Sequence, residues 1–143
     1  MEKNGTIKLL AEISPTLCER FSIDLAYVFG SANSERFRSQ SDIDIAVRFK
    51  SEIPTSEFFR LSALFEVELA RLLRRKIDVS ILNLAPPLLR YEVVKNGRVL
   101  FSADNEQRAL FHIRTYRDYD DFCHAQNFYI QALRQRLQGR VQS

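Results

Sequence analysis

Two short segments of alternating polarity constrain the fold of this chain more than any other feature. Residues 42–49 read Asp-Ile-Asp-Ile-Ala-Val-Arg-Phe, and residues 77–82 read Ile-Asp-Val-Ser-Ile-Leu. Because successive side chains of a β-strand point to opposite faces of a sheet, each segment is predicted to be a strand with its aliphatic residues on one face. Asp42, Asp44 and Asp78 then lie on the other face, so the sequence predicts two strands that can bring acidic side chains together.

Helical and strand patterns alternate along the rest of the chain. Residues 3–21 favour a helix that Pro15 interrupts, and Ser14 is expected to cap a second short helix after the break. Residues 55–75 predict an amphipathic helix whose apolar stripe comprises Phe58, Leu61, Leu64, Phe65, Leu69 and Leu72. The other elements expected are a strand at 25–29, a helical turn and loop at 32–41, a helix from Pro86-Pro87 to Asn96 ended by Gly97, a strand at 98–101, and a long helix over 104–138 that begins with a capping box of Asp104 and Gln107.

This order of elements predicts an α/β (α+β) fold in which helices flank one mixed β-sheet. A chain of 143 residues with 45% hydrophobic residues suits a single domain, with a core at about residues 22–103 followed by the C-terminal helix. Most apolar side chains of that helix are expected to pack on the domain, and its part beyond residue 122 could dock a partner helix. The side chains concerned are Tyr116, Tyr119, Phe122, Phe128, Tyr129, Leu133 and Leu137.

The overall charge and the cysteines narrow the class of protein. A net charge of +3 would help to attract an anionic substrate such as ATP, but it does not by itself indicate a nucleic-acid ligand. Cys18 and Cys123 are far apart and are expected to be free thiols. No apolar run approaches the ~20 residues that span a bilayer, so a cytoplasmic protein without a membrane contact is expected. His112 and His124 do not share a helix face, so a zinc site is not expected.

Three elements of the sequence point to phosphate and metal chemistry. Gly30 and Ser31 lie where a strand turns towards a helix, and the free N–H groups of such a turn favour phosphate oxygens. Asp42 and Asp44 lie two positions apart on one strand, and carboxylates that converge on one face bind hard divalent cations. Asp78 lies on the next predicted strand with the same polarity pattern. Neighbouring carboxylates resist ionisation unless a cation joins them, which favours a metal site.

These motifs resemble those of a known superfamily. The segments Phe29-Gly30-Ser31 and Ser41-Asp42-Ile43-Asp44-Ile45-Ala46-Val47 resemble the signature of the DNA polymerase β-like nucleotidyltransferases. The segments 76–79, 83–90 and 96–101 look like the minimal nucleotidyltransferases (MNT), which are antitoxin partners of HEPN-domain toxins. The resemblance covers about residues 22–120.

The resemblance implies a site and an activity. The resemblance implies two Mg²⁺ ions, held by the catalytic residues Asp42, Asp44 and Asp78. Asp78 would also orient or deprotonate the attacking hydroxyl. Gly30, Ser31, Ser41 and Arg36 would bind the nucleotide. Similar antitoxins transfer AMP from ATP to a tyrosine of the HEPN toxin, which blocks its RNase activity, so a hetero-oligomer with such a toxin is implied.

One departure from the family pattern keeps alternatives open. Family members carry an arginine and a glycine after the Gly-Ser turn, where this chain has Ser34 and Glu35, and Arg36 or Arg38 would have to supply the positive charge. A catalytically weak antitoxin that masks the toxin by binding is therefore an alternative. A small-molecule nucleotidyltransferase is a third reading, although such enzymes use an added helical domain for which 143 residues leave little room.

Overall fold

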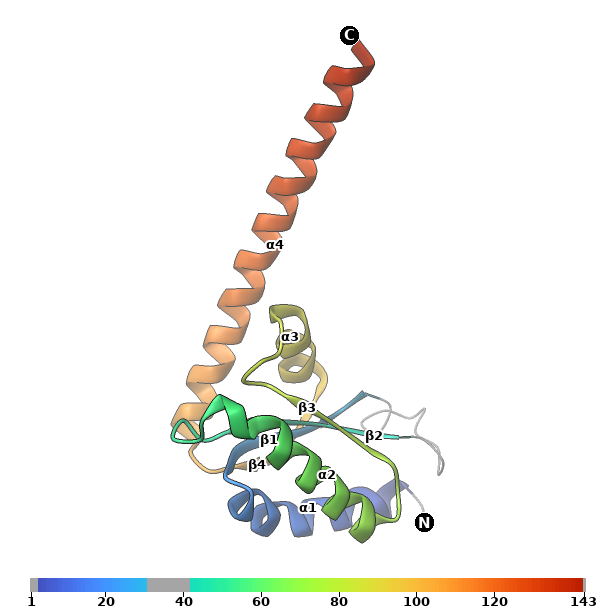
Figure 1. Cartoon of the computed structure of the whole chain (residues 1–143), viewed down its shortest axis with the longest axis vertical. Coiled ribbons are helices and arrows are strands. Elements are labelled where there is room, and N and C mark those ends of the chain that lie inside the picture. The colour runs from blue at the N-terminus through green and yellow to red at the C-terminus, as the bar shows by residue number, and fades with distance from the viewer. Residues whose placement is uncertain (1–2, 31–41, 143) are drawn as a thin grey trace.

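The structure is a computed structural model that describes residues 3–30 and 42–142. Helices and strands alternate along most of the chain (Figure 1). Within these residues the predicted element order is confirmed, and the bounds move by a few residues; the helical turn and loop predicted at 32–41 lie outside the described part of the chain. The elements are α1 (Lys3–Arg20), β1 (Ile23–Phe29), β2 (Ile43–Phe49), the 3-10 turn η2 (Thr55–Glu57), α2 (Phe58–Leu73), β3 (Ile77–Ile81), α3 (Pro87–Asn96), β4 (Arg98–Ser102) and α4 (Asn105–Gln142).

The strands form one mixed sheet in the order β3-β2-β1-β4. β1 pairs antiparallel with both β2 and β4, whereas β2 and β3 run parallel. The parallel pair is joined through α2, as a crossover between parallel strands requires. The predicted mixed sheet is therefore confirmed, with β2 lying between β1 and β3.

Each face of the sheet has its own hydrophobic core. α1 and α2 cover one face, and α3 and the start of α4 cover the other (Figure 1). Ile43, Ile45 and Val47 of β2 are buried on the α1/α2 face. Ala46 is buried on the α3/α4 face, beside Tyr27 of β1. The alternation predicted for residues 42–49 is confirmed, and it directs Asp44 to the α3/α4 face.

The break predicted in the first helix is wrong. α1 runs through Pro15 without interruption, and Ser14 does not cap a second helix. Its hydroxyl donates a hydrogen bond back to the carbonyl of Leu10, at 2.5 Å. Proline removes only one backbone donor, and here Leu10, Leu17 and neighbouring side chains anchor both halves of the helix in the core. Tertiary packing thus outweighs the local cost of the proline.

The amphipathic stripe of the second predicted helix is only partly confirmed. Phe58, Phe65 and Leu69 are buried, but Leu64 and Leu72 are exposed. The helix ends at Leu73, where Arg74 takes a left-handed conformation with φ 53°. The buried arc of α2 is narrower than the apolar arc because only one side of the helix reaches the sheet.

α3 ends at Gly97, as predicted, but not through a left-handed glycine. Gly97 has φ −82°, and its N–H donates to the carbonyl of Val93. A side-chain carbon at Gly97 would collide with that same carbonyl and would approach the carbonyl of Val28 to 3.2 Å. The position therefore requires glycine because the backbones of α3 and β1 come close together.

The base of α4 is fixed to the body of the protein. Asp104 caps the helix by accepting hydrogen bonds from the N–H groups of Glu106 and Gln107, which confirms the aspartate half of the predicted capping box. Farther along, the ring of Tyr119 stacks on Tyr91 of α3 with centroids 3.7 Å apart. These contacts hold the first half of the helix against α3.

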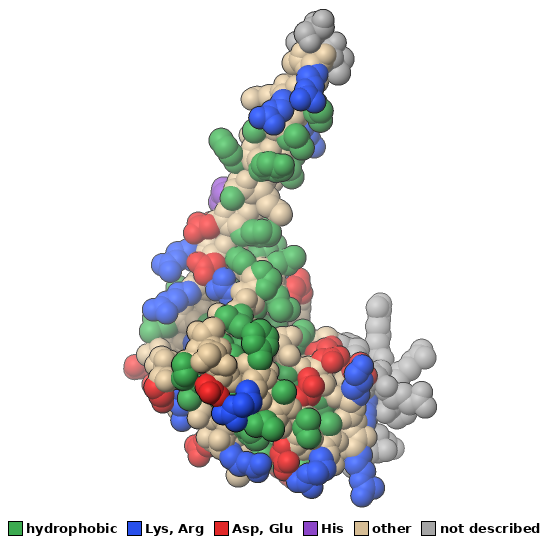
Figure 2. Space-filling model, in the orientation of Figure 1, with side chains coloured by type: hydrophobic (Ala, Val, Ile, Leu, Met, Phe, Trp, Pro, Cys, Tyr) green, Lys and Arg blue, Asp and Glu red, His purple; other side chains and the backbone are tan. Residues whose placement is uncertain are grey.

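The expectation that most apolar side chains of the last helix pack on the domain is wrong. Tyr119 packs and Phe122 is half-buried, but Tyr116, Phe128, Tyr129, Leu133 and Leu137 are exposed. A helix of 38 residues is about 57 Å long, which is far more than a four-stranded sheet can cover. Its second half projects away from the body (Figures 1 and 2). Within the described residues, no helix is long and apolar enough to cross a membrane.

Candidate active site

The candidate site lies at the end of the sheet where β1 finishes and β2 begins (Figure 1). Asp44 is its central residue, because β2 has a neighbouring strand on each side. Phe29 of β1 lies opposite Asp44 in the antiparallel pair, and Asp78 of β3 lies opposite it in the parallel pair. The backbone register therefore places the glycine that follows Phe29 and the carboxylate of Asp78 on either side of Asp44.

Gly30 lies directly against the carboxylate of Asp44. Its φ is +68°, a left-handed conformation that glycine adopts at little cost. A side-chain carbon built at Gly30 would overlap Oδ2 of Asp44. Only a glycine therefore allows the end of β1 to approach the acid so closely. The sequence predicted glycine here for close approach to a ligand, and the structure shows that it also makes room for Asp44.

The acids of the site influence one another. The pKa of Asp44 is raised above its ordinary value, first because the carboxyl is partly buried and then because Asp78 and Asp42 are negatively charged. Asp78 is itself exposed, although it neighbours Asp44 in register. Partial burial and two like charges both disfavour a charged Asp44. A cation at this point would relieve that penalty.

Asp42 has a partner that the sequence did not reveal. Nζ of Lys76 lies 3.5 Å from Oδ2 of Asp42. The two residues stand just before β2 and β3, and the N–H of Ile43 donates to the carbonyl of Lys76 at 3.0 Å. From the sequence alone, Lys76 belongs to a basic run that is predicted to complement the C-terminal end of the helix before it; the run comprises Arg71, Arg74, Arg75 and Lys76. The register of parallel strands is the signal that would have paired Lys76 with Asp42 instead.

The donor set is of the right type for a hard divalent cation. Carboxylate oxygens are the ligands that Mg²⁺ prefers, and the raised pKa of Asp44 marks excess negative charge. Among the residues that the structure describes, however, no group of three or more His, Cys, Asp or Glu side chains is gathered closely enough to hold a metal ion. The side chain of Asp42 is engaged by Lys76 instead. The residues therefore fit the ion by chemistry, and the carboxylates would have to rotate to bind it.

Several predicted nucleotide-binding residues lie outside the described part of the chain. Ser31, Arg36 and Ser41 fall within residues 31–41, as do Ser34 and Glu35, which depart from the family pattern. The predicted role of these residues therefore stays a prediction.

Both cysteines are free, and Cys18 is buried in the core on the α1/α2 face of the sheet. His112 serves a structural purpose, since its Nε2 meets the hydroxyl of Tyr27 at 2.5 Å.

Comparison with solved structures finds the same fold in toxin–antitoxin complexes. A crystal structure of a toxin–antitoxin with AMP-PNP contains a chain 24% identical to this one, with a TM-score of 0.61, covering 93% of this chain and 98% of that chain. A complex of tri-AMPylated Shewanella oneidensis HEPN toxin with MNT antitoxin contains a chain 23% identical, with a TM-score of 0.59 and coverage of 95% and 98%. A structure described as a minimal nucleotidyltransferase is 26% identical, with a TM-score of 0.56 and coverage of 68% and 95%.

A comparison with curated proteins finds no match to the chain, but a comparison with models of protein families does. The model of the family described as polymerase beta, nucleotidyltransferase matches residues 11–106, which is more than half of the chain and includes Gly30, Asp42, Asp44 and Asp78. The mixed sheet, the glycine turn and the acids of neighbouring strands all lie within this match. The chain therefore belongs to the polymerase beta nucleotidyltransferase family.

Proposed function

We propose that this nucleotidyltransferase is an antitoxin that transfers AMP from ATP to a tyrosine hydroxyl of a HEPN-domain toxin and so neutralises it. One observation carries the proposal: Asp44 stands between Gly30 and Asp78 at the end of the sheet. Two similar folds come from toxin–antitoxin complexes, one with AMP-PNP and one with an AMPylated HEPN toxin. They support both the nucleotide and the partner.

The proposed reaction is a substitution at the α-phosphorus of ATP. The tyrosine oxygen forms a bond to this phosphorus, the bond to the β-phosphate oxygen breaks, and pyrophosphate leaves. Asp78 is exposed and can orient the acceptor hydroxyl and accept its proton. The turn at Gly30 would bring backbone groups to the phosphates, because it carries no side chain to keep them away. Mg²⁺ held by Asp42, Asp44 and Asp78 would supply neutralisation of the triphosphate and a lower pKa of the acceptor hydroxyl.

Lys76 adds a feature to this scheme. Its ammonium group holds Asp42 at 3.5 Å, so it occupies the place beside Asp42 that a cation would take. Asp42 would hold Mg²⁺ only with the Lys76 side chain turned away from it. Lys76 is exposed, so its ammonium group would then be free to contact the triphosphate.

Label transfer from ATP tests the proposal. The purified protein is incubated with α-labelled ATP, Mg²⁺ and a HEPN toxin, and label on the toxin is counted. Removing a general base typically lowers a rate by about 10²–10⁴-fold, so Asp78→Asn should lower transfer by at least about 100-fold while the fold is kept. Asp104→Asn is the matched control, since asparagine caps a helix as well as aspartate and the residue follows β4 at the opposite end of the sheet.

The outcomes separate the alternatives. Unchanged transfer by Asp78→Asn would remove that residue from the mechanism. Toxin neutralised without any label would favour the binding-only antitoxin. Label on a small molecule instead of the toxin would favour the third reading, an enzyme that modifies small molecules.

A further inference from the structure

The distal half of α4 has no covering element within the described chain. Every described side chain from His124 to Arg140 is exposed. The contacts to α3 end near Tyr119, where the helix leaves the body (Figure 1). Most helical stability in proteins comes from packing of an apolar face on a neighbour and not from intrinsic helix propensity. The distal half therefore needs a partner surface.

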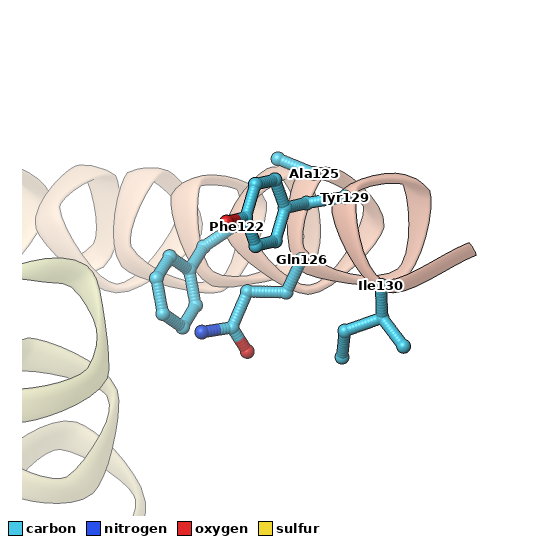
Figure 3. A pocket seen from close by; sticks show the side chains of 5 residues that line it. All are labelled: Phe122, Ala125, Gln126, Tyr129 and Ile130. Atoms are coloured by element: carbon cyan, nitrogen blue, oxygen red, sulfur yellow. The ribbon is translucent and has the colours of Figure 1, made fainter. Parts of the chain in front are cut away.

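Five apolar side chains of this region and that of Gln126 form a stripe, and the exposed Phe128 lies outside it. At 100° per residue, its members fall within an arc of about 100°, which is the width of a helix face that packs on a neighbour. Phe122, Gln126 and Ile130 extend from the same side of the helix (Figure 3). Together with Ala125 and Tyr129 they line a shallow hollow of about 440 Å³. We call this set the distal stripe, and it comprises Phe122, Gln126, Tyr129, Ile130, Leu133 and Leu137.

The spacing of the distal stripe is symmetric. Successive members lie 4, 3, 1, 3 and 4 residues apart, so the pattern reads the same in both directions from a point between Tyr129 and Ile130. Two copies related by a twofold axis at this point would run antiparallel and place Phe122 against Leu137 and Gln126 against Leu133. Such an interface is self-complementary, as a twofold dimer requires. A parallel pair or an unrelated partner gains nothing from this symmetry.

The charges that flank the distal stripe differ in sign at its two ends. Asp118, Asp120 and Asp121 follow Arg117 at its start, where Asp118 also pairs with Arg90 of α3, and Arg134, Arg136 and Arg140 lie towards its end. Antiparallel pairing brings the basic end of one helix beside the acidic end of the other, whereas parallel pairing puts like charges together. Charges flanking an apolar seam select partner and orientation in this way. An acidic partner would match only the arginines, whereas a second copy matches both ends.

We infer that the distal stripe is the interface of a homodimer in which two copies of α4 pair antiparallel about a twofold axis between Tyr129 and Ile130. The dimer would place the two nucleotidyltransferase bodies at opposite ends of a two-helix stem. The inference is independent of the proposed function, because the stem contains none of the acids of the candidate site. Loss of transfer in Asp78→Asn would leave the stem unchanged.

The mass of the purified chain in solution tests the dimer. Sedimentation equilibrium at micromolar concentration should give twice the monomer mass of 16.7 kDa. Ile130→Glu places two carboxylates at the axis and should shift the protein to monomer, with at least a tenfold weaker self-association. Phe128→Glu is the matched control: this side chain is 75% exposed and lies outside the distal stripe, so the variant should remain dimeric. Both substitutions fall on exposed helix positions, and circular dichroism checks that each variant is folded.

A distance measurement tests the orientation. A spin label is attached at Gln138→Cys in a Cys123→Ser background, and Cys18 should not take up the label because it is buried. The labelled residue lies about 8.5 residues from the proposed axis. Two labels in an antiparallel dimer are therefore separated by about 25 Å along the helices at a rise of 1.5 Å per residue. In a parallel dimer they would be separated only by the distance between helix axes, about 8–10 Å, plus the label arms.

Four results would overturn the inference. These are a monomer at all concentrations, a dimer that survives Ile130→Glu, equal loss in Phe128→Glu, or the short label distance. A chain that is monomeric alone and loses HEPN toxin binding in Ile130→Glu would assign the distal stripe to the toxin instead.

Discussion

The contact between Gly30 and Asp44 gives the sharpest quantitative prediction. Gly30→Ala introduces two costs. A residue other than glycine at φ +68° costs roughly 1–2 kcal/mol, and the new methyl group must push the Asp44 carboxylate off its rotamer for about 0.5–1.5 kcal/mol. Alanine also restricts the unfolded chain more than glycine does, which offsets these costs by roughly 0.4–1 kcal/mol. We therefore expect a net loss of about 2 kcal/mol in the free energy of unfolding.

Half of this loss should disappear when Asp44 is shortened. In an Asp44→Ala background the methyl group introduced by Gly30→Ala meets no carboxylate, so only the backbone cost remains, at roughly 1 kcal/mol. The expected coupling energy between the two substitutions is then about 1 kcal/mol. Independent sites add to within about 0.3–0.5 kcal/mol, so this coupling is measurable.

Urea denaturation of the four proteins in the cycle measures the coupling. Midpoints and slopes give the free energy of unfolding for the original protein, the two single variants and the double variant. Gly139→Ala is the control, because nothing lies within 4 Å of that glycine and alanine favours the helix by about 0.5–1 kcal/mol. Additive behaviour of Gly30→Ala and Asp44→Ala would refute the contact. Label transfer should also fall at least about tenfold in Gly30→Ala, because the displaced Asp44 is a proposed metal ligand.

Three further variants probe charge, burial and backbone. Asp44→Asn should stabilise the metal-free protein increasingly as pH rises. The pKa of Asp44 is raised in the folded state, so the original protein loses stability as pH rises above the ordinary pKa of an aspartate, whereas the variant does not. Melting curves recorded with EDTA at pH 4 and pH 7.5 measure this difference, and an equal difference at both pH values would contradict it. Tyr27→Phe should cost about 1 kcal/mol, because the buried hydroxyl meets Nε2 of a neutral His112, and an unchanged urea midpoint would contradict that bond. Pro15→Ala should stabilise by about 1–3 kcal/mol, because it restores the donor to the carbonyl of Ala11, and a lower melting temperature would show that proline suits this position.

The sequence was sufficient for the sheet because strand signals and core signals agreed. In β2 the same alternation that predicts a strand also separates aliphatic from acidic residues, and both halves of this prediction agree with the structure. The error in α1 shows the opposite case. There the local signals of Ser14 and Pro15 indicated a break, but burial of apolar side chains on both sides of the proline held the helix together. Local propensity fails where packing supplies more free energy than the propensity costs.

Long-range pairing limited what could be predicted of the site. The sequence places Asp42, Asp44 and Asp78 on strands, but the ion pair between Lys76 and Asp42 depends on which strands are neighbours and on their direction. The exposed half of α4 is a similar case. Apolar spacing predicts a face that needs burial, but whether the domain or another chain covers it depends on how far the helix extends beyond the sheet.

The hydrophobic core and the candidate site specify each other through a single register. Shifting β2 by one residue against its neighbours would turn Ile43, Ile45 and Val47 out of the α1/α2 core and would bury Asp44 in their place. A buried unpaired carboxylate and the loss of three aliphatic side chains from the α1/α2 core would both be costly, so the core holds the register that puts Asp44 opposite Asp78. The acids can therefore tolerate mutual repulsion, since the free energy that keeps them together comes from the other face of the sheet. This explains how Asp44 can stay in place although its pKa is raised by its acidic neighbours and by partial burial.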